Sequence, residues 1–405
     1  MSPYVVKIAA REMHNIGRTV GSFYAISTVG SVIGTLLTGF VLIAYLGVNQ
    51  IFVLTGSLLI ALGIIYFLFF RRKWAVALAA LLPFLLLPQQ SHVSKIMSDG
   101  TKVDRITDRD SFYGNLKVVD YSYQTTHYRE LLIDGLVQGG MDMNNGLSVY
   151  EYPYLLQALP YALNPDGKNC LVIGLGAGLV PTWYQAQGVK TEVVDIDPAV
   201  VELARNYFGF NPSIPVHIED ARYFLTSSTQ RYDYLILDVF NGDTTPGHLL
   251  SVEAMRLAKQ RLTLSGVLAV NLVGSVSHNT LMTSSIIKTL QSVFDQVEIY
   301  PAFDTSLGMG TGNIEIVAYD GAPRPLQFDH IGNFTFHTTV EQIVRRSMKQ
   351  PFVLQQHADA MILTDNYNPV DFYDLWLKEL VRKVILDTTD FDILLSRSDV
   401  PALST

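Results

Sequence analysis

Four stretches of this sequence carry residues suited to holding a nucleoside. The sequence Gly174-Leu175-Gly176-Ala177-Gly178 follows an apolar run and precedes a helical pattern. Its glycines would let the backbone turn tightly and approach a ligand beside free helix N–H groups. Asp195 comes 21 residues after Gly174, about the distance at which an acid binds a ribose diol in dinucleotide folds. Asp220 follows a third apolar run and could accept a hydrogen bond from an adenine amino group, and Asp238 follows a fourth. These positions predict a nucleoside site, with helix capping as the alternative role of each acid.

A sheet is needed to bring these residues together. From Asn169 onward, apolar runs alternate with helical patterns, which is typical of a parallel sheet covered by helices on both faces. In such sheets ligands bind beyond the carboxyl ends of the strands, where all four stretches fall. The predicted strands are Cys170–Ile173, Thr191–Ile196, Val216–Ile218, Tyr232–Leu237, Val267–Leu272, Val297–Tyr300 and Ile314–Ala318.

A small β region is expected before this sheet. Gly114–Tyr121 and Tyr128–Ile133 have the composition of strands, and Asp134-Gly135 has the chemistry of a turn. The preceding segment, Gln89–Thr101, is polar and is interpreted as a linker.

The N-terminal part of the chain is apolar enough for a membrane. No Asp, Glu, Lys or Arg occurs between Thr19 and Phe70, and about 20 apolar residues suffice to span a bilayer. Val20–Tyr45 and Ile51–Phe70 are therefore predicted to be transmembrane helices. Trp74–Pro88 is shorter and contains a proline, so a full span, a re-entrant segment and an interfacial helix remain open.

Charge separates this part from the rest. Residues 1–98 carry seven Lys and Arg and one Glu, a net charge of +6, and since the whole chain is −8, residues 99–405 carry −14. The negative charge of residues 99–405 argues against nucleic acid as a binding partner, because phosphates bind clusters of Lys and Arg. The single cysteine, Cys170, excludes a disulfide within the chain and argues against a Cys-ligated zinc site.

The motifs resemble those of the spermidine synthase (polyamine aminopropyltransferase) family, which belongs to the S-adenosylmethionine-dependent methyltransferase fold class. The resemblance rests on Val172–Gly178, Val194–Pro198, Glu219–Arg222, Tyr232–Asp238 and Asp134–Gln138, the last similar to the family's Asp-Gly-x-x-Gln turn. It implies an α/β, S-adenosylmethionine-methyltransferase-like (Rossmann-like) fold with a seven-stranded sheet, preceded by a small β region and N-terminal transmembrane helices.

More closely, the chain resembles membrane-fused spermidine synthase-like proteins. Their Asp-x-Phe-x-Gly-Asp, Pro-x-His-Leu and Leu-Thr-Asp-x-x-x-Pro motifs are matched by Asp238–Asp243, Pro246–Leu249 and Leu363–Pro369. His248 is expected to bond a loop carbonyl, with a base beside Asp243 as the alternative. The expected parts are a transmembrane segment in residues 1–90, a linker in 91–101, a small β domain in 102–148, a nucleoside-binding catalytic domain in 149–325 and a helical extension in 326–405.

The resemblance also implies a reaction and a set of roles. In spermidine synthases an amine attacks the aminopropyl carbon of decarboxylated S-adenosylmethionine, and methylthioadenosine leaves. Asp238 matches the catalytic acid, which would orient and deprotonate the amine. No metal is expected. The expected cofactor-binding residues are Gly174, Gly176, Gly178, Asp195, Asp220, Ala221 and Gln138, and the expected substrate-binding residues are Asp243, Tyr113, Glu151 and Asp365.

Departures from the family pattern leave the substrates open. Ala177 stands where the family has an acid that holds the donor's amine, Gly114 stands where it has a glutamine, and Asn241 replaces an acid that grips a diamine. The co-substrate is therefore decarboxylated or intact S-adenosylmethionine, and the acceptor is a small amine or polyamine. The alternatives are an S-adenosylmethionine-dependent methyltransferase and a non-catalytic nucleoside-sensing membrane protein.

A nucleoside co-substrate drawn from the cytosol places the soluble domain on the cytoplasmic face. The expectation is then a multi-pass protein of the cell inner membrane or plasma membrane, in contact with lipid, whose Trp74–Pro88 segment does not cross. Gly30 and Gly34 lie on a stripe of small residues that is compatible with a homo-oligomer.

Overall fold

The computed structural model describes residues 16–43, 46–66, 68, 93–240, 246–305, 310–331, 334–373, 375, 378–380 and 382–383. The chain divides into two units, one formed by residues 1–88 and 110–112 and the other by residues 89–109 and 113–405.

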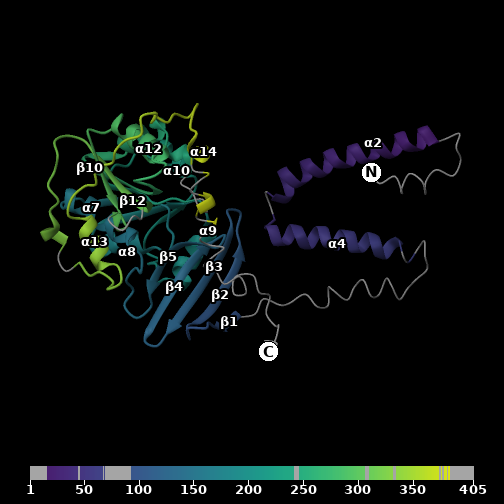
Figure 1. Ribbon diagram of the computed structural model, residues 1–405, viewed down its shortest axis with the longest axis horizontal. Helices are drawn as coiled ribbons and strands as arrows, with labels where there is room; N and C mark the ends of the chain where they lie inside the picture. The colour runs from purple at the N-terminus through teal and green to yellow at the C-terminus, as the bar shows by residue number, and fades with distance from the viewer. Residues whose placement is uncertain are drawn as a thin grey trace. The chain divides into compact units, whose positions relative to one another are not determined.

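The N-terminal unit holds two apolar helices (Figure 1). Helix α2 covers Ile16–Leu37 and continues as a π-helical turn, η2, over Thr38–Leu42, and α4 covers Val48–Tyr66. Within the described residues, only Val20–Leu42 is long and apolar enough to cross a membrane, because the apolar stretch of α4 has fewer than 18 residues. The prediction of two spanning helices is therefore supported for the first alone, and a multi-pass arrangement is not supported. The Trp74–Pro88 segment lies outside the described residues.

The second unit begins with a five-stranded antiparallel sheet in chain order. Two of its strands, β3 and β4, are the two predicted ones, and Asp134-Gly135 forms the turn after them, with positive φ angles of 52° and 84°. The expected linker over residues 91–101 is corrected at β1, because an edge strand with alternate residues exposed can be polar and still pair with β2. The strands are β1 Val93–Ile96, β2 Lys102–Asp110, β3 Asn115–Tyr123, β4 Thr126–Ile133 and β5 Leu136–Asp142.

The larger sheet has seven strands in the order β8-β7-β6-β9-β10-β12-β11. All seven predicted strands are present, although most extend by one or more residues beyond the predicted ends. They are β6 Asn169–Ile173, β7 Lys190–Asp195, β8 Val216–Ile218, β9 Tyr232–Leu237, β10 Leu262–Ser275, β11 Gln296–Pro301 and β12 Thr311–Tyr319.

One strand departs from the expected parallel arrangement. Strand β12 runs antiparallel to both of its neighbours, β10 and β11. Only the nine residues 302–310 connect β11 to β12. A parallel crossover needs about a dozen residues or more, so this connection permits only an antiparallel pair.

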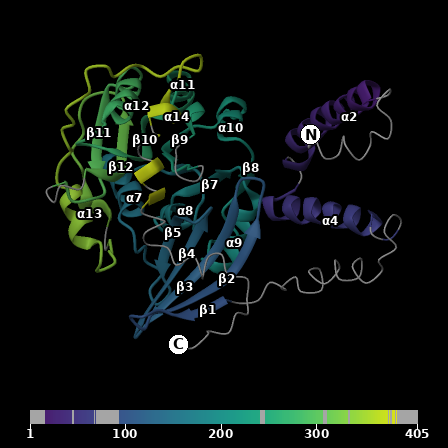
Figure 2. The same cartoon turned by 45° about the vertical axis from the view of Figure 1, so that its right-hand side comes forward.

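Helices cover both faces of the large sheet (Figure 2). Helices α7 (Tyr152–Leu163), α8 (Leu179–Ala186) and α9 (Pro198–Tyr207) pack on one face, and α10 (Ala221–Ser227), α11 (Val252–Gln260) and α12 (Leu281–Gln291) on the other. Alternate strand residues point to opposite faces, so every strand of this sheet except β8 supplies both cores. The described part of the chain after residue 325 contains only short helices, η6 Phe328–Ile331, α13 Glu341–Ser347 and α14 Val370–Tyr373.

Candidate active site

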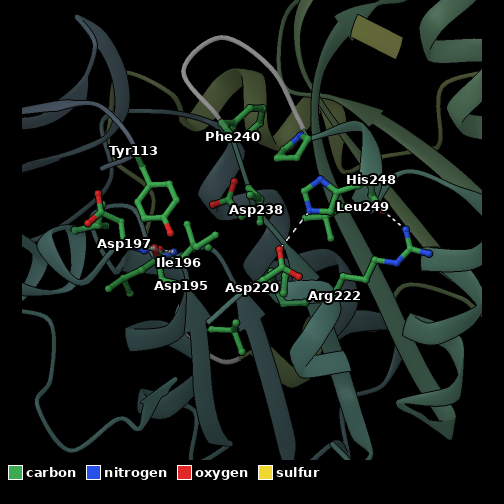
Figure 3. A pocket seen from close by; sticks show the side chains of 18 of the residues that line it. Tyr113, Asp195, Ile196, Asp197, Asp220, Arg222, Asp238, Phe240, His248 and Leu249 are labelled. Carbon is green, nitrogen blue, oxygen red and sulfur yellow. Dashed lines mark hydrogen bonds and ion pairs between the residues drawn. The ribbon is translucent and has the colours of Figure 1, made fainter. Parts of the chain in front are cut away.

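The carboxyl ends of β6, β7, β8 and β9 border one cavity of about 700 Å³ (Figure 3). Most of the predicted site residues line it, although they come from distant parts of the chain. Those at the cavity are Tyr113, Gln138, Gly174, Gly176, Asp195, Asp220, Ala221, Asp238 and Asp365.

The glycine loop after β6 is held against the end of β9. Gly174 has a φ of +88°, and a Cβ placed on it would lie 2.0 Å from the carbonyl oxygen of Asp238. The Gly174 N–H donates to the Val194 carbonyl (2.8 Å), so the loop is tied to β7 as well. Gly178 caps α8 with a φ of +79° and packs on Phe210, so it shapes the loop without lining the cavity.

Asp195 is fixed by the backbone of this loop. Its carboxylate accepts hydrogen bonds from the N–H groups of Leu175 and Asp197, both at 2.8 Å. Burial raises the pKa of Asp195 to about 6, against the opposing effect of these hydrogen bonds. A carboxylate accepts at four lone-pair positions, so two remain for the hydroxyl groups of a ligand.

Asp220 both lines the cavity and caps a helix. It accepts from the Tyr223 N–H (2.9 Å) at the start of α10. His248 Nε2 lies 3.4 Å from its second carboxyl oxygen, as Figure 3 shows. His248 therefore has an acid as its partner rather than the expected loop carbonyl, and Asp243 lies outside the described residues.

Asp238 is oriented by two asparagines. Asn271 Nδ2 donates to Asp238 Oδ1 (2.8 Å), and Asn313 Nδ2 donates to Asn271 Oδ1 (3.0 Å). Burial raises the pKa of Asp238 to about 6, and the Asn271 hydrogen bond opposes that rise. A carboxyl with this pKa is largely ionised at neutral pH and still basic enough to take a proton. The asparagines were missed by sequence reasoning, because the pairing of β10 with β9 places Asn271 beside Asp238 and the pairing of β10 with β12 places Asn313 beside Asn271.

A C-terminal segment reaches the same cavity. Arg222 Nη1 donates to Asp365 Oδ1 (2.7 Å), and Arg222 Nη2 is bonded to the other carboxyl oxygen. These hydrogen bonds hold the pKa of Asp365 below its ordinary value. The segment is fixed further by Asn368, whose Nδ2 donates to the Gly247 carbonyl (2.6 Å). Arg222 belongs to the Glu219–Arg222 motif of the sequence, but the sequence did not predict that it pairs with Asp365.

The remaining predicted residues are placed differently. Tyr113 lies near the acids Asp195, Asp197 and Asp220. Its pKa is raised mainly by burial and to a lesser extent by the negative charges of these acids. Glu151 occupies the N-cap position of α7, makes no capping hydrogen bond through its side chain, and does not line this cavity. Ile196 and Leu249, which sequence reasoning did not single out, supply apolar walls. In the part of the chain that the structure describes, no group of three or more His, Cys, Asp or Glu is placed to hold a metal ion.

A seven-stranded sheet with such a cavity at its strand ends defines an S-adenosylmethionine-methyltransferase-like α/β domain. Residues 150–305 match the spermine/spermidine synthase domain. The match covers less than half of the chain.

Several known proteins are similar to the chain. A polyamine aminopropyltransferase from Vibrio vulnificus is 39% identical over 128 residues, which are 30% of this chain and 43% of that protein. An N-terminal histidine N-methyltransferase from Emericella nidulans is 33% identical over 168 residues, 40% of this chain and 30% of that protein. The chain thus spans less than half the length of either relative. A crystal structure of a probable spermidine synthase from Corynebacterium glutamicum has a TM-score of 0.49 at 17% identity, covering 63% of this chain and 98% of that one.

Proposed function

We propose that this protein transfers the aminopropyl group of decarboxylated S-adenosylmethionine to a small amine and releases methylthioadenosine. The observation that carries the proposal is Asp238, an acid whose pKa is raised to about 6 by burial and which lines the same cavity as Asp195 and Asp220. The domain match and the aminopropyltransferase relative support the same reaction class.

The residues divide the work between binding and proton transfer. In the proposed reaction the amine lone pair forms a bond to the aminopropyl carbon, and the electrons of the C–S bond move to the sulfonium sulfur. The proton lost by the amine passes to the Asp238 carboxylate and then to solvent. Asp195 would bind the ribose hydroxyls and Asp220 the adenine, while Ile196 and Leu249 would contact the base. Asn271 keeps Asp238 oriented toward the amine.

A methyltransferase is the second candidate. It is favoured by Ala177, a buried side chain in the glycine loop that offers no charge to a donor's amine, and by the N-methyltransferase relative. The two reactions differ in their nucleoside product, which is methylthioadenosine for aminopropyl transfer and S-adenosylhomocysteine for methyl transfer.

Mass spectrometry of small-molecule products tests the proposal. The detergent-purified full chain would be incubated with intact or decarboxylated S-adenosylmethionine and a panel of amines. We expect methylthioadenosine together with an amine that has gained one aminopropyl group. S-adenosylhomocysteine would show methyl transfer instead. Donor binding without any product would refute both activities and leave a nucleoside-sensing domain.

We further propose that α2 attaches the domain to a membrane, because it is the helix whose length and composition fit a span. We expect the full chain to stay in the membrane pellet after carbonate washing and the domain to be cleaved by protease on the cytoplasmic side only. Release by carbonate would contradict attachment, and protection of the domain from cytoplasmic protease would contradict its placement.

A further inference from the structure

Glu315 is a buried acid without a partner. It lies in β12 with no exposed surface, and neither carboxyl oxygen has a hydrogen-bond partner among the residues that the structure describes. Leaving a buried polar group unsatisfied destabilises a protein, and more so when the group is charged. Because native proteins keep few such groups, the presence of Glu315 requires a physical reason.

Glu315 belongs to a row of polar residues that begins at the cavity. It pairs across the sheet with Asn271 of β10, whose side chain donates to Asp238. All three side chains lie on the face that α7 covers. Their alternate neighbours Ile236, Ala269 and Val317 pack in the core on that face.

Two further acids affect Glu315. The charges that affect Glu315 are those of Asp238 and of Glu151 at the start of α7, and both are negative. Together with burial they raise the pKa of Glu315 well above its ordinary value. An acid set of this kind lacks the positive charge that would let all of its members ionise.

The row adjoins the glycine loop through Tyr152. This tyrosine is affected by the charges of both Asp238 and Glu315, and its hydroxyl donates to the Gln138 carbonyl (3.0 Å). A Cβ placed on Gly139 would lie 3.6 Å from that hydroxyl and 3.2 Å from the Ala177 Cβ. The unpartnered acid thus lies across the sheet from Asn271, the residue that bonds Asp238 at the cavity.

We propose that Glu315, together with Glu151 and Asp238, binds a primary ammonium group of a ligand. An ammonium carries one positive charge and three N–H donors, which match a carboxylate that lacks both a counter-charge and a donor. A ligand group that carries its own carboxylate is disfavoured by the same three acids. Two ligands could carry this ammonium group, the decarboxylated donor at its aminopropyl end and the amine acceptor. In naming these two ligands the inference rests on the proposed function.

Equilibrium binding to the full chain, measured by calorimetry, tests the inference without turnover. The donor probes are decarboxylated S-adenosylmethionine, intact S-adenosylmethionine and methylthioadenosine, which has no ammonium. The acceptor probes are butane-1,4-diamine and butylamine, each with methylthioadenosine present. We expect Glu315→Gln to weaken the ligand whose ammonium it binds by about tenfold, as for loss of a charge-assisted hydrogen bond, and to leave methylthioadenosine unchanged. A loss of affinity among the donor probes would assign the ammonium to the donor, and a loss among the acceptor probes would assign it to the acceptor.

A matched variant separates binding from stability. Glu298→Gln alters a glutamate on β11 that accepts from the hydroxyls of Tyr300 (2.6 Å) and Tyr319 (2.7 Å). We expect Glu298→Gln to lower Tm without changing the preference among ligands. Glu315→Gln should not lower the Tm of the empty protein, because no hydrogen bond is lost and a neutral side chain replaces a buried acid whose pKa is raised.

Two results would overturn the ammonium site. One is wild-type affinity of Glu315→Gln for every probe, and the other is an equal loss for methylthioadenosine and the ammonium-bearing ligands. A selective loss in Glu315→Gln combined with no aminopropyl product would keep the ammonium site and refute the transfer reaction.

Discussion

Replacing Asp238 with asparagine is expected to lower kcat about 1,000-fold and to change the affinity for methylthioadenosine, which carries no ammonium, by less than about threefold. The amide removes the group that takes the amine's proton. Its oxygen can still accept the hydrogen bond from Asn271, so the loop geometry should persist. Product formation by mass spectrometry and methylthioadenosine binding by calorimetry are the two measurements.

The control for this variant is Glu192→Gln. Glu192 lies in β7, outside the residues that line the cavity, and it bonds His217 and Tyr232. It should leave kcat unchanged. An Asp238→Asn protein that retains full turnover would remove Asp238 from the chemistry, and one that also loses the donor would indicate a damaged loop.

The pH profile of the wild-type enzyme reports the same group. The basic form is required, so activity should fall about tenfold per pH unit below the pKa and level off above it. With the pKa of Asp238 raised to about 6, the plateau should begin just above that pH. The pKa of Asp195 is also raised to about 6, so the profile must be measured with saturating donor to isolate proton transfer.

Replacing Gly174 with alanine is expected to abolish donor binding and to destabilise the domain by about 3 kcal/mol more than Gly188→Ala. Both glycines have positive φ angles, +88° and +77°, so both variants share the cost of that conformation. They differ in space, because a Cβ at Gly174 would meet the Asp238 carbonyl at 2.0 Å while nothing lies within 4 Å of one at Gly188. Backbone hydrogen bonds join Gly174 to Val194 and Asp238 to Ile173, so neither side can move away freely.

Denaturant unfolding and methylthioadenosine binding of the two full-length variants provide the comparison. Gly188→Ala should bind the donor as the wild type does. Equal stability and equal binding of the two variants would contradict the close packing of the glycine loop on the end of β9.

Several features of the fold follow from local sequence. Seven apolar runs separated by helical patterns predicted all seven strands, because burial of a strand on two faces demands an unbroken apolar stretch. The antiparallel placement of β12 was not predicted, since it depends on a connection that is too short for a crossover. The predicted membrane part is supported for one helix alone, because the apolar stretch of α4 within the described residues is shorter than a span requires.

The candidate site shows the same division. The order of apolar runs along the chain was enough to predict that a glycine loop and the acids Asp195, Asp220 and Asp238 follow successive strands. The carboxyl ends of parallel strands then lie at one edge of the sheet. The bonding of Arg222 to Asp365, the orientation of Asp238 by Asn271, and the burial of Glu315 without a partner among the described residues depend on the folded arrangement. Those pairings join residues far apart in the chain through strand register and side-chain packing. The spacing of residues along one sequence does not contain that information.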